Sequence, residues 1–463
     1  MEPDLDRFTS RRSTVYGQRG VVATSQPLAS QAGIETLREG GNAFDAAVAT
    51  AAALNVVEPT STGLGGDVFA LYRTADGEVG AMRACGGAPA AATIGNVREA
   101  LQSDDDADSY YPDDGGYAVD DTDEAGMPFY GPHAVTVPGT ARGWEATIEE
   151  LGRLTLADVL EPAIRYATEG YPVSEVIASY WAGAEELFTD DHAREAFLFD
   201  GDAPETGETV RLPRLGESMR KIAEHGADVV YEGEIAEAIA EEIQSQGGFM
   251  TVDDLADFEV EWPEPVSTTY NGAEVYELPP NNQGLIALEA LNIAAELGAG
   301  EHDYDTAERV HYFAEAMKLA FHDGHRYIAD PEYEETPPLG SADWAAKRAT
   351  GVGPTADHDV IHLTFNDVGR TPGDQYWLYV SKDTGRLDRW AYHLEGMPEE
   401  APPQHYQWTE YRDLTAPAGT VRLAARKEAT GANRALLTHN LALPSTPPDG
   451  AFSNPEPMLG GEE

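Results

Sequence analysis

The chain has 463 residues, and its 82 acidic and 30 basic side chains give a formal net charge of −52. Because the acid is spread along the whole length, the surface repels phosphate backbones and anionic headgroups, which argues against nucleic acid and membranes as partners. Dispersed acid is typical of proteins that work in high salt, where screening relieves self-repulsion, so we expect a halophilic, cytoplasmic protein.

Cysteine content and targeting signals agree with this expectation. Cys85 is the only cysteine, which excludes an intramolecular disulfide and a multi-cysteine metal site. The N-terminus has no charged-then-apolar signal pattern, and no apolar run approaches the roughly 18 residues that span a bilayer. We therefore expect a soluble intracellular protein, with more than one domain because the chain is long.

The N-terminal third combines helices with a glycine-rich loop. Residues 27–57 place apolar side chains at helical spacing, and Gly40-Gly41-Asn42 interrupts them, which predicts two helices joined by a tight turn. The second helix is so rich in alanine that close packing against another element is expected. A glycine-rich loop at 61–66 then precedes a strand at 68–73, and the Asp- and Gly-rich segment 103–126 predicts an exposed acidic loop.

The remaining elements are predicted from the same periodicities. They are a strand followed by a turn at 134–139, helices over most of 141–244, extended segments around 266–277 and a long helix at 311–322. The composition changes near Gly351, beyond which strands are predicted at 362–365, 376–380 and 389–394. We therefore expect a first domain over residues 1–350, a small antiparallel β unit over 351–442, and a disordered tail over 443–463.

Several short motifs follow one another between Gly17 and Arg348. They are Asn42 with Asp45, Glu58-Pro59, Gly63 to Gly66, Ala88 to Thr93, Val135 to Gly139 with Trp144, Leu278 to Asn281, Glu315 to Phe321 and Tyr327 to Pro331. In this order they resemble the large-chain part of the γ-glutamyltransferase (glutathione hydrolase) family, including its acylase-like branch. Any one motif is weak evidence, but their collinearity identifies the family.

The resemblance implies an α/β fold, an αββα sandwich of the N-terminal-nucleophile hydrolase type. In the family, a precursor cuts itself into a large and a small chain, and the new N-terminal threonine attacks a γ-glutamyl or related small amide. The free α-amine of that threonine, with a pKa near 8, acts as the base. Backbone N–H groups of a glycine pair stabilise the oxyanion.

The sequence departs from the family at the nucleophile. The best register of the cleavage motif runs from Asp359 to Asp367 and places Val360, which has no hydroxyl, at the nucleophile position. Thr364 is the fallback nucleophile, but it lies mid-strand in an alternating apolar pattern, which favours a structural role. The glycine pair has no counterpart downstream, and too few residues follow for the family's small chain. We therefore expect an incomplete, truncated sandwich that is inactive as this single chain.

A second, weaker resemblance covers the C-terminal β unit. The segments Thr371 to Tyr379 and Leu387 to Trp390 resemble a small β-sheet protein of the lipoprotein-carrier-like kind. A gene fusion or an assembly error that joined two fragments would explain both halves.

Two residues near the Ala88-Pro89 pair are candidates for function. The resemblance places the arginine that binds the substrate carboxylate three residues before this pair, where the chain has Cys85. Arg83, two positions away, is the candidate substrate-binding residue, with a surface arginine among acids as the alternative. A thiol nucleophile at Cys85 is conceivable, but no base can be placed beside it, and a buried small hydrophobe is favoured.

The sequence predicts no metal site and no cofactor. His311, Glu315 and His322 share a helix face, and His322 and His325 have a ligand-like spacing, but no further ligand suggests itself. The loop at 61–66 could cradle a phosphate, but no Lys-Ser/Thr pair follows it. A packing turn, or part of an active-site wall, is the better interpretation.

Two functions from different classes remain open. The leading one is an amide hydrolase or acyltransferase by descent, acting on a γ-glutamyl or related small amide. The alternative is a non-catalytic remnant or fusion that serves as a binding or structural module. A third arrangement adds a separate small chain as a partner. A mass spectrum distinguishes a processed enzyme, which gives two chains, from a remnant, which gives one.

Overall fold

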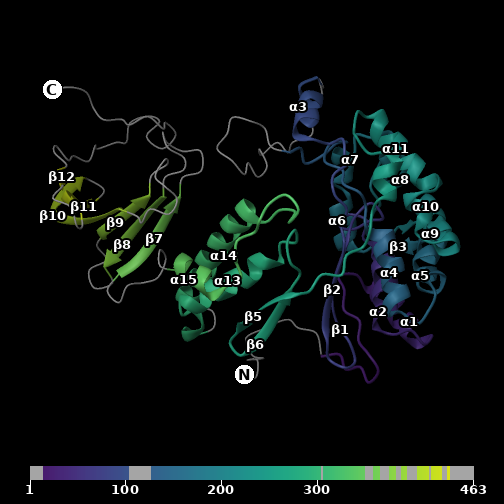
Figure 1. Ribbon diagram of the computed structural model, residues 1–463, viewed down its shortest axis with the longest axis horizontal. Helices are drawn as coiled ribbons and strands as arrows, with labels where there is room; N and C mark the ends of the chain where they lie inside the picture. Colours follow the sequence, from purple (N-terminus) through teal and green to yellow (C-terminus); the bar gives the residue numbers. More distant parts are fainter. Residues whose placement is uncertain are drawn as a thin grey trace. The chain divides into compact units, whose positions relative to one another are not determined.

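The computed structural model describes residues 14–103, 127–303 and 306–349, and six strands between residues 358 and 437 (Figure 1). By contacts the chain forms two compact units, the first ending at Pro263 and the second beginning at Glu264. The predicted boundary at residue 350 falls outside the described residues, as do most of the predicted acidic loop at 103–126 and all of the tail at 443–463. In the part described, no helix is both long and apolar enough to cross a membrane.

The core of the first unit is built on two closely packed helices. Helix α1 spans Pro27–Arg38 and α2 spans Ala43–Val57, as predicted, and Gly40 between them has a φ of 107°. Helix α2 buries alanines on several faces, and small side chains allow neighbouring backbones to approach. A Cβ on Gly33 of α1 would lie 2.3 Å from Oγ1 of Thr50 on α2, so this approach requires glycine.

Helices α4 and α5 of the first unit pack on this pair. Helix α5 packs on both α2 and α9, and Trp144, Trp181 and Tyr231 are almost completely buried in the same core. The helices are α3 (Ile94–Ser103), α4 (Thr140–Leu151), α5 (Leu156–Glu169), α6 (Glu175–Trp181), α7 (Ala184–Leu187), α8 (Asp191–Phe197), α9 (Pro213–His225), α10 (Asp228–Tyr231), α11 (Glu234–Ser245) and α12 (Val252–Ala256). The helices predicted across 141–244 are therefore confirmed.

The first unit contains two small antiparallel sheets among its described residues. Strands β1 (Val68–Arg73) and β2 (Val79–Ala84) pair with Val68 opposite Ala84, and β3 (Tyr171–Pro172) pairs with β4 (Thr209–Val210). Helix α4 packs on this β1–β2 ribbon.

The predicted strand at 134–139 is wrong. Val137 exchanges two hydrogen bonds with Gly86 and Gly87, at 3.2 and 3.0 Å, but the backbone forms no regular ladder. The reason is local: Pro138 has no N–H to donate, and α4 begins at Thr140, so pairing cannot continue.

The second unit begins with a hairpin followed by helices. Strands β5 (Val266–Tyr270) and β6 (Ala273–Glu277) match the extended segments predicted there. Asn271 and Gly272 both have positive φ, at 50° and 81°, as a tight Asn-Gly hairpin turn requires. The helices that follow are α13 (Gly284–Glu296), the 3-10 turn η3 (Ala299–Glu301), α14 (Ala307–Tyr327) and α15 (Ala342–Ala349). Helix α14 contains the long helix predicted at 311–322.

Six antiparallel strands make up the described part of the chain after residue 350. They are β7 (His358–Thr364), β8 (Gln375–Ser381), β9 (Leu387–His393), β10 (Gln404–Ala416), β11 (Gly419–Ala429) and β12 (Ala435–Leu437). Each pairs with the next along the chain, so the sheet runs from β7 at one edge to β12 at the other. Strands β7 to β9 contain most of the three segments predicted as strands.

Candidate functional site

The candidate substrate-side residues gather at one end of the β1–β2 ribbon. Asp67 immediately precedes β1, and Arg83 and Cys85 lie at the end of β2 and just beyond it. Because β1 and β2 are antiparallel, with Val68 opposite Ala84, Asp67 and Cys85 are brought together. The first turn of α4 lies against the same end, since a Cβ on Gly139 would lie 1.9 Å from the carbonyl oxygen of Ala84.

Cys85 is half-buried and donates its thiol hydrogen bond to Asp67. Burial raises the pKa of the Asp67 carboxyl, while this hydrogen bond and one from the Gly139 N–H oppose that rise. Burial, followed by the Asp67 charge, raises the pKa of the Cys85 thiol to about 12. The thiol is therefore protonated at neutral pH and cannot act as a thiolate nucleophile. Cys85 is also only half-buried, whereas the sequence favoured a buried small hydrophobe.

Arg83 is held by Glu261 through both backbone and side chain. The two backbones exchange N–H to O hydrogen bonds of 2.9 Å each, and Nε of Arg83 lies 3.0 Å from Oε2 of Glu261, with Nη2 in contact with the same oxygen. The Arg83 side chain is only 11% exposed, against 59% for Glu261. A substrate carboxylate would therefore have to displace Glu261 to reach the guanidinium, and the substrate-binding role of Arg83 stays a prediction.

The glycine-rich loop is hydrogen-bonded to the start of α4. Gly66 donates to the carbonyl of Gly63 at 3.1 Å, and its own carbonyl accepts from the N–H groups of Gly139 and Thr140, at 2.9 and 3.0 Å. The Thr140 hydroxyl adds a 3.2 Å bond to the carbonyl of Gly63. A phosphate cradle needs such helix N-terminal donors free. Here they are used within the protein, which supports the packing interpretation of the loop.

Val360 and Thr364 lie on β7, in the second unit, whereas Arg83 belongs to the first. Val360 is the third residue of β7 and pairs with Tyr379 of β8. Thr364 is the last residue of the strand and pairs with Gln375, so its predicted mid-strand position is wrong. Val360, at the position predicted for the nucleophile, thus lies inside a paired strand.

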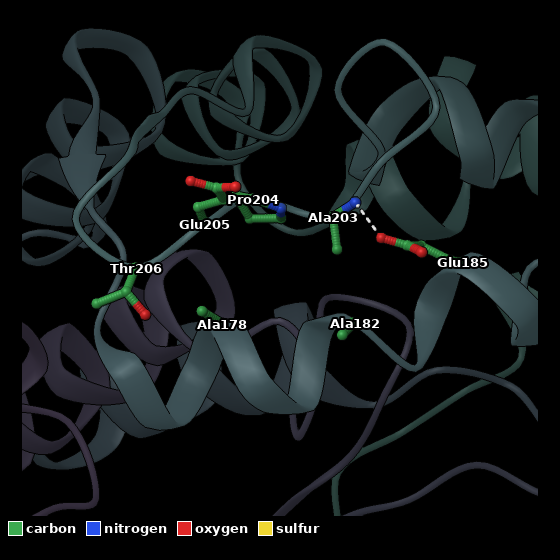
Figure 2. A pocket seen from close by; sticks show the side chains of 7 residues that line it. All are labelled: Ala178, Ala182, Glu185, Ala203, Pro204, Glu205 and Thr206. Carbon is green, nitrogen blue, oxygen red and sulfur yellow. Dashed lines mark hydrogen bonds between the residues drawn. The ribbon is translucent and has the colours of Figure 1, made fainter.

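A groove between α6 and the segment 203–206 is one pocket among the described residues (Figure 2). Its volume is about 460 Å³, and its walls are mainly small side chains and two carboxylates, Glu185 and Glu205. Glu185 accepts a 2.9 Å hydrogen bond from the Ala203 N–H, which fastens the segment to α7. The groove contains no predicted site residue and no candidate nucleophile.

The histidines considered as metal ligands lie on α14. Lys318 contacts Glu315 on this helix at 3.1 Å, which commits that carboxylate to an ion pair. Among the residues that the structure describes, no group of three or more His, Cys, Asp or Glu side chains could hold a metal ion.

Sequence reasoning missed three acidic residues that decide the local chemistry. Asp67 adds to the effect of burial in raising the pKa of Cys85, and Glu261, 178 residues from Arg83 along the chain, binds the Arg83 guanidinium. Only the fold brings the second pair together, so no local pattern could reveal it. Glu289, by contrast, interrupts the otherwise apolar first half of α13, which is a visible signal of a special environment.

The sequence model of the family described as gamma-glutamyltranspeptidase matches residues 29–386. The chain belongs to this family. The match includes β7 and β8, and so both Val360 and Thr364. The family resemblance, including its acylase-like branch, is thereby confirmed.

One curated relative and two solved structures illustrate the similarity of the chain to known proteins. The chain is 37% identical over 326 residues to the glutathione hydrolase-like YwrD proenzyme of Bacillus subtilis (strain 168), covering 70% of this chain and 58% of that protein. The cephalosporin acylase structure from Bacillus halodurans has a TM-score of 0.66 at 37% identity, and the match covers 85% of this chain and 68% of that one. The gamma-glutamyltranspeptidase structure from Helicobacter pylori has a TM-score of 0.63 at 30% identity, and the match covers 73% of this chain and 93% of that one.

These likenesses show an N-terminal-nucleophile-hydrolase-type fold with mixed helices and strands. The chain spans a little over half the length of the curated relatives it matches.

Proposed function

We propose that the chain carries the large-chain region of a γ-glutamyltransferase-family amide hydrolase or acyltransferase, and that it cleaves no amide by itself. The observation that carries this proposal is Val360, which stands inside β7 at the position expected for the nucleophile. Both self-cleavage and amide attack in the family depend on a hydroxyl there. Valine offers neither a nucleophile nor a group for the acyl shift.

The substrate side of the site favours a small amide without a carboxylate at the position of Cys85. A γ-glutamyl α-carboxylate would meet a protonated thiol there, with the Asp67 carboxyl behind it. A carboxylate next to Asp67 would be repelled or would have to take up a proton. The nearest cation, Arg83, is already paired with Glu261. The acylase-like relatives supply the precedent for amides other than γ-glutamyl ones.

A non-catalytic binding or structural module is the alternative, and the Arg83–Glu261 ion pair, which occupies the candidate substrate-binding arginine, favours it. A separate small chain that supplies the hydroxyl and the oxyanion donors is the other arrangement consistent with Val360. We place the protein in a high-salt cytoplasm because its charge of −52 needs screening.

The experiment compares hydrolysis of γ-glutamyl anilide and of an uncharged acyl anilide in molar KCl. The purified full chain, Val360→Thr and Thr364→Ala are assayed alongside a chain in which a complete small-chain sequence of the family is grafted after Arg348. We expect background rates for the first three and restored processing and hydrolysis in the graft, with the uncharged anilide preferred. Hydrolysis by the chain as written, abolished by Thr364→Ala, would show that the nucleophile was misplaced.

A further inference from the structure

A buried pair of carboxyl groups in the second unit stands apart from the candidate site. Glu289 of α13 and Asp323 of α14 are both 0% exposed. Trp344 of α15 donates its indole N–H to both, at 3.0 Å to Glu289 and 2.9 Å to Asp323. Helix α13 packs on both α14 and α15 (Figure 1).

One cation, Arg348, interacts with these two carboxyl groups. Arg348 of α15 grips Asp323 with two nitrogens, Nε at 2.6 Å from Oδ2 and Nη2 in contact with Oδ1. Both oxygens of Asp323 are therefore occupied by the guanidinium, which leaves no open ligand for a metal ion. If both carboxyls were ionised, the cluster would bury an uncompensated negative charge, which is very unfavourable in a protein interior.

The geometry shows where a compensating proton fits. Oε1 of Glu289 accepts from Trp344, whereas Oε2 is buried with no hydrogen-bond donor against it among the described residues. A proton on Oε2 would remove the negative charge of this buried carboxyl group. In agreement, burial, followed by the hydrogen bond to Asp323 and its charge, raises the pKa of the Glu289 carboxyl to about 9.

The two residues of α15 that contact the carboxyl groups lie on the side of the helix that packs against the rest of the unit. Trp344 and Arg348 lie on one side of α15, together with Ala345 and Ala349, which pack into the apolar core between α13 and α14. Alanine contacts contribute little area, so the polar cluster supplies much of the specificity of docking. We propose that Glu289, Asp323, Trp344 and Arg348 form a clasp that holds α15 only while Glu289 carries a proton.

The charged groups that face Glu289 come from two neighbouring helices, Asp323 from α14 and Arg348 from α15. The β5–β6 hairpin also packs on α13, and it contributes Glu277, whose carboxylate lies beside Gly284 at the start of that helix.

The sign of the pH dependence follows from linkage. When α15 opens, Glu289 becomes solvated and ionises with an ordinary carboxyl pKa, whereas in the closed state it keeps its proton up to about pH 9. Opening therefore releases one proton between these values. The equilibrium constant for docking of α15 is therefore largest in mild acid. Above the ordinary carboxyl pKa it falls tenfold per pH unit, until Glu289 ionises in the closed state as well.

The test is hydrogen exchange of the full chain in molar KCl, read on peptides that cover α15. Comparing variants at the same pH cancels the intrinsic pH dependence of exchange. Between pH 6 and 8, protection in the wild type should fall about 100-fold relative to Glu289→Gln, whose amide mimics the protonated acid. Glu296→Gln, which removes an exposed carboxyl from the same helix, should follow the wild type, and peptides from α1 should not respond to either substitution.

Two outcomes would overturn the proposal. One is the same pH dependence of α15 protection in Glu289→Gln and wild type. The other is strong α15 protection in Asp323→Asn, which removes the carboxylate that Arg348 holds. If Glu289→Gln folds poorly, infrared spectroscopy of the wild type decides: a protonated-carboxyl band at pH 7 that is lost by pH 10 is expected, and its absence at pH 7 refutes the clasp.

Discussion

Replacing Asp45 by alanine should destabilise the first unit strongly, although Asp45 touches none of the candidate site residues. Its carboxylate is completely buried at the start of α2 and accepts backbone N–H groups from Asn42, at 2.6 Å, and from Arg153 and Leu154, at 3.0 and 3.1 Å. It thereby ties the N-terminus of α2 to the chain between α4 and α5. The motif Asn42 with Asp45 is thus explained by architecture and not by catalysis.

The magnitude follows from the donors that Asp45→Ala leaves behind. Three part-buried N–H groups lose a charged acceptor, at about 1–3 kcal/mol each, and partial relaxation and water entry reduce the sum to about 3–6 kcal/mol. Urea unfolding in molar KCl, followed by circular dichroism, measures the change. Glu39→Ala, at an exposed position just after α1, is the matched control and should stay within about 0.5 kcal/mol of the wild type. A loss below about 1 kcal/mol in Asp45→Ala would refute the reasoning.

Two further predictions concern the candidate site and the surface. Cys85 should react slowly with iodoacetamide at neutral pH, because burial and the Asp67 charge raise its pKa to about 12. Asp67→Asn should speed the reaction. Equal rates in the variant and the wild type would contradict the proposed interaction between the thiol and the Asp67 carboxylate. Native circular dichroism and melting temperature should rise from low to molar KCl, because 52 uncompensated negative charges repel one another unless screened; a signal independent of salt would contradict the halophilic interpretation.

Much of the fold could be predicted because helices and hairpins leave their signals within short stretches of the sequence. The α1–α2 pair was visible in its periodicity and its Gly40 turn, and the β5–β6 hairpin coincides with an Asn-Gly turn. The segment 134–139 misled because β-branched residues suggest a strand, whereas Pro138 and the start of α4 stop the ladder after one exchange.

The candidate site was less predictable because its decisive contacts are long-range. Arg83 is readable as a cation in the sequence, but its pairing with Glu261 depends on a bridge across the fold. Likewise, Asp67 and Cys85 meet only because β1 and β2 form an antiparallel ribbon. Val360 differs from these pairs, since its predicted place at the nucleophile position comes from the sequence alone, and the structure adds that the residue lies within β7.

The most direct test of the central claim is the intact mass of the full chain after purification and prolonged incubation in molar KCl. A single mass equal to the 463-residue chain, unchanged with time, is the predicted result, because Val360 cannot support the acyl shift. Two masses that correspond to a break between Asp359 and Val360, or before Thr364, together with anilide hydrolysis, would contradict it.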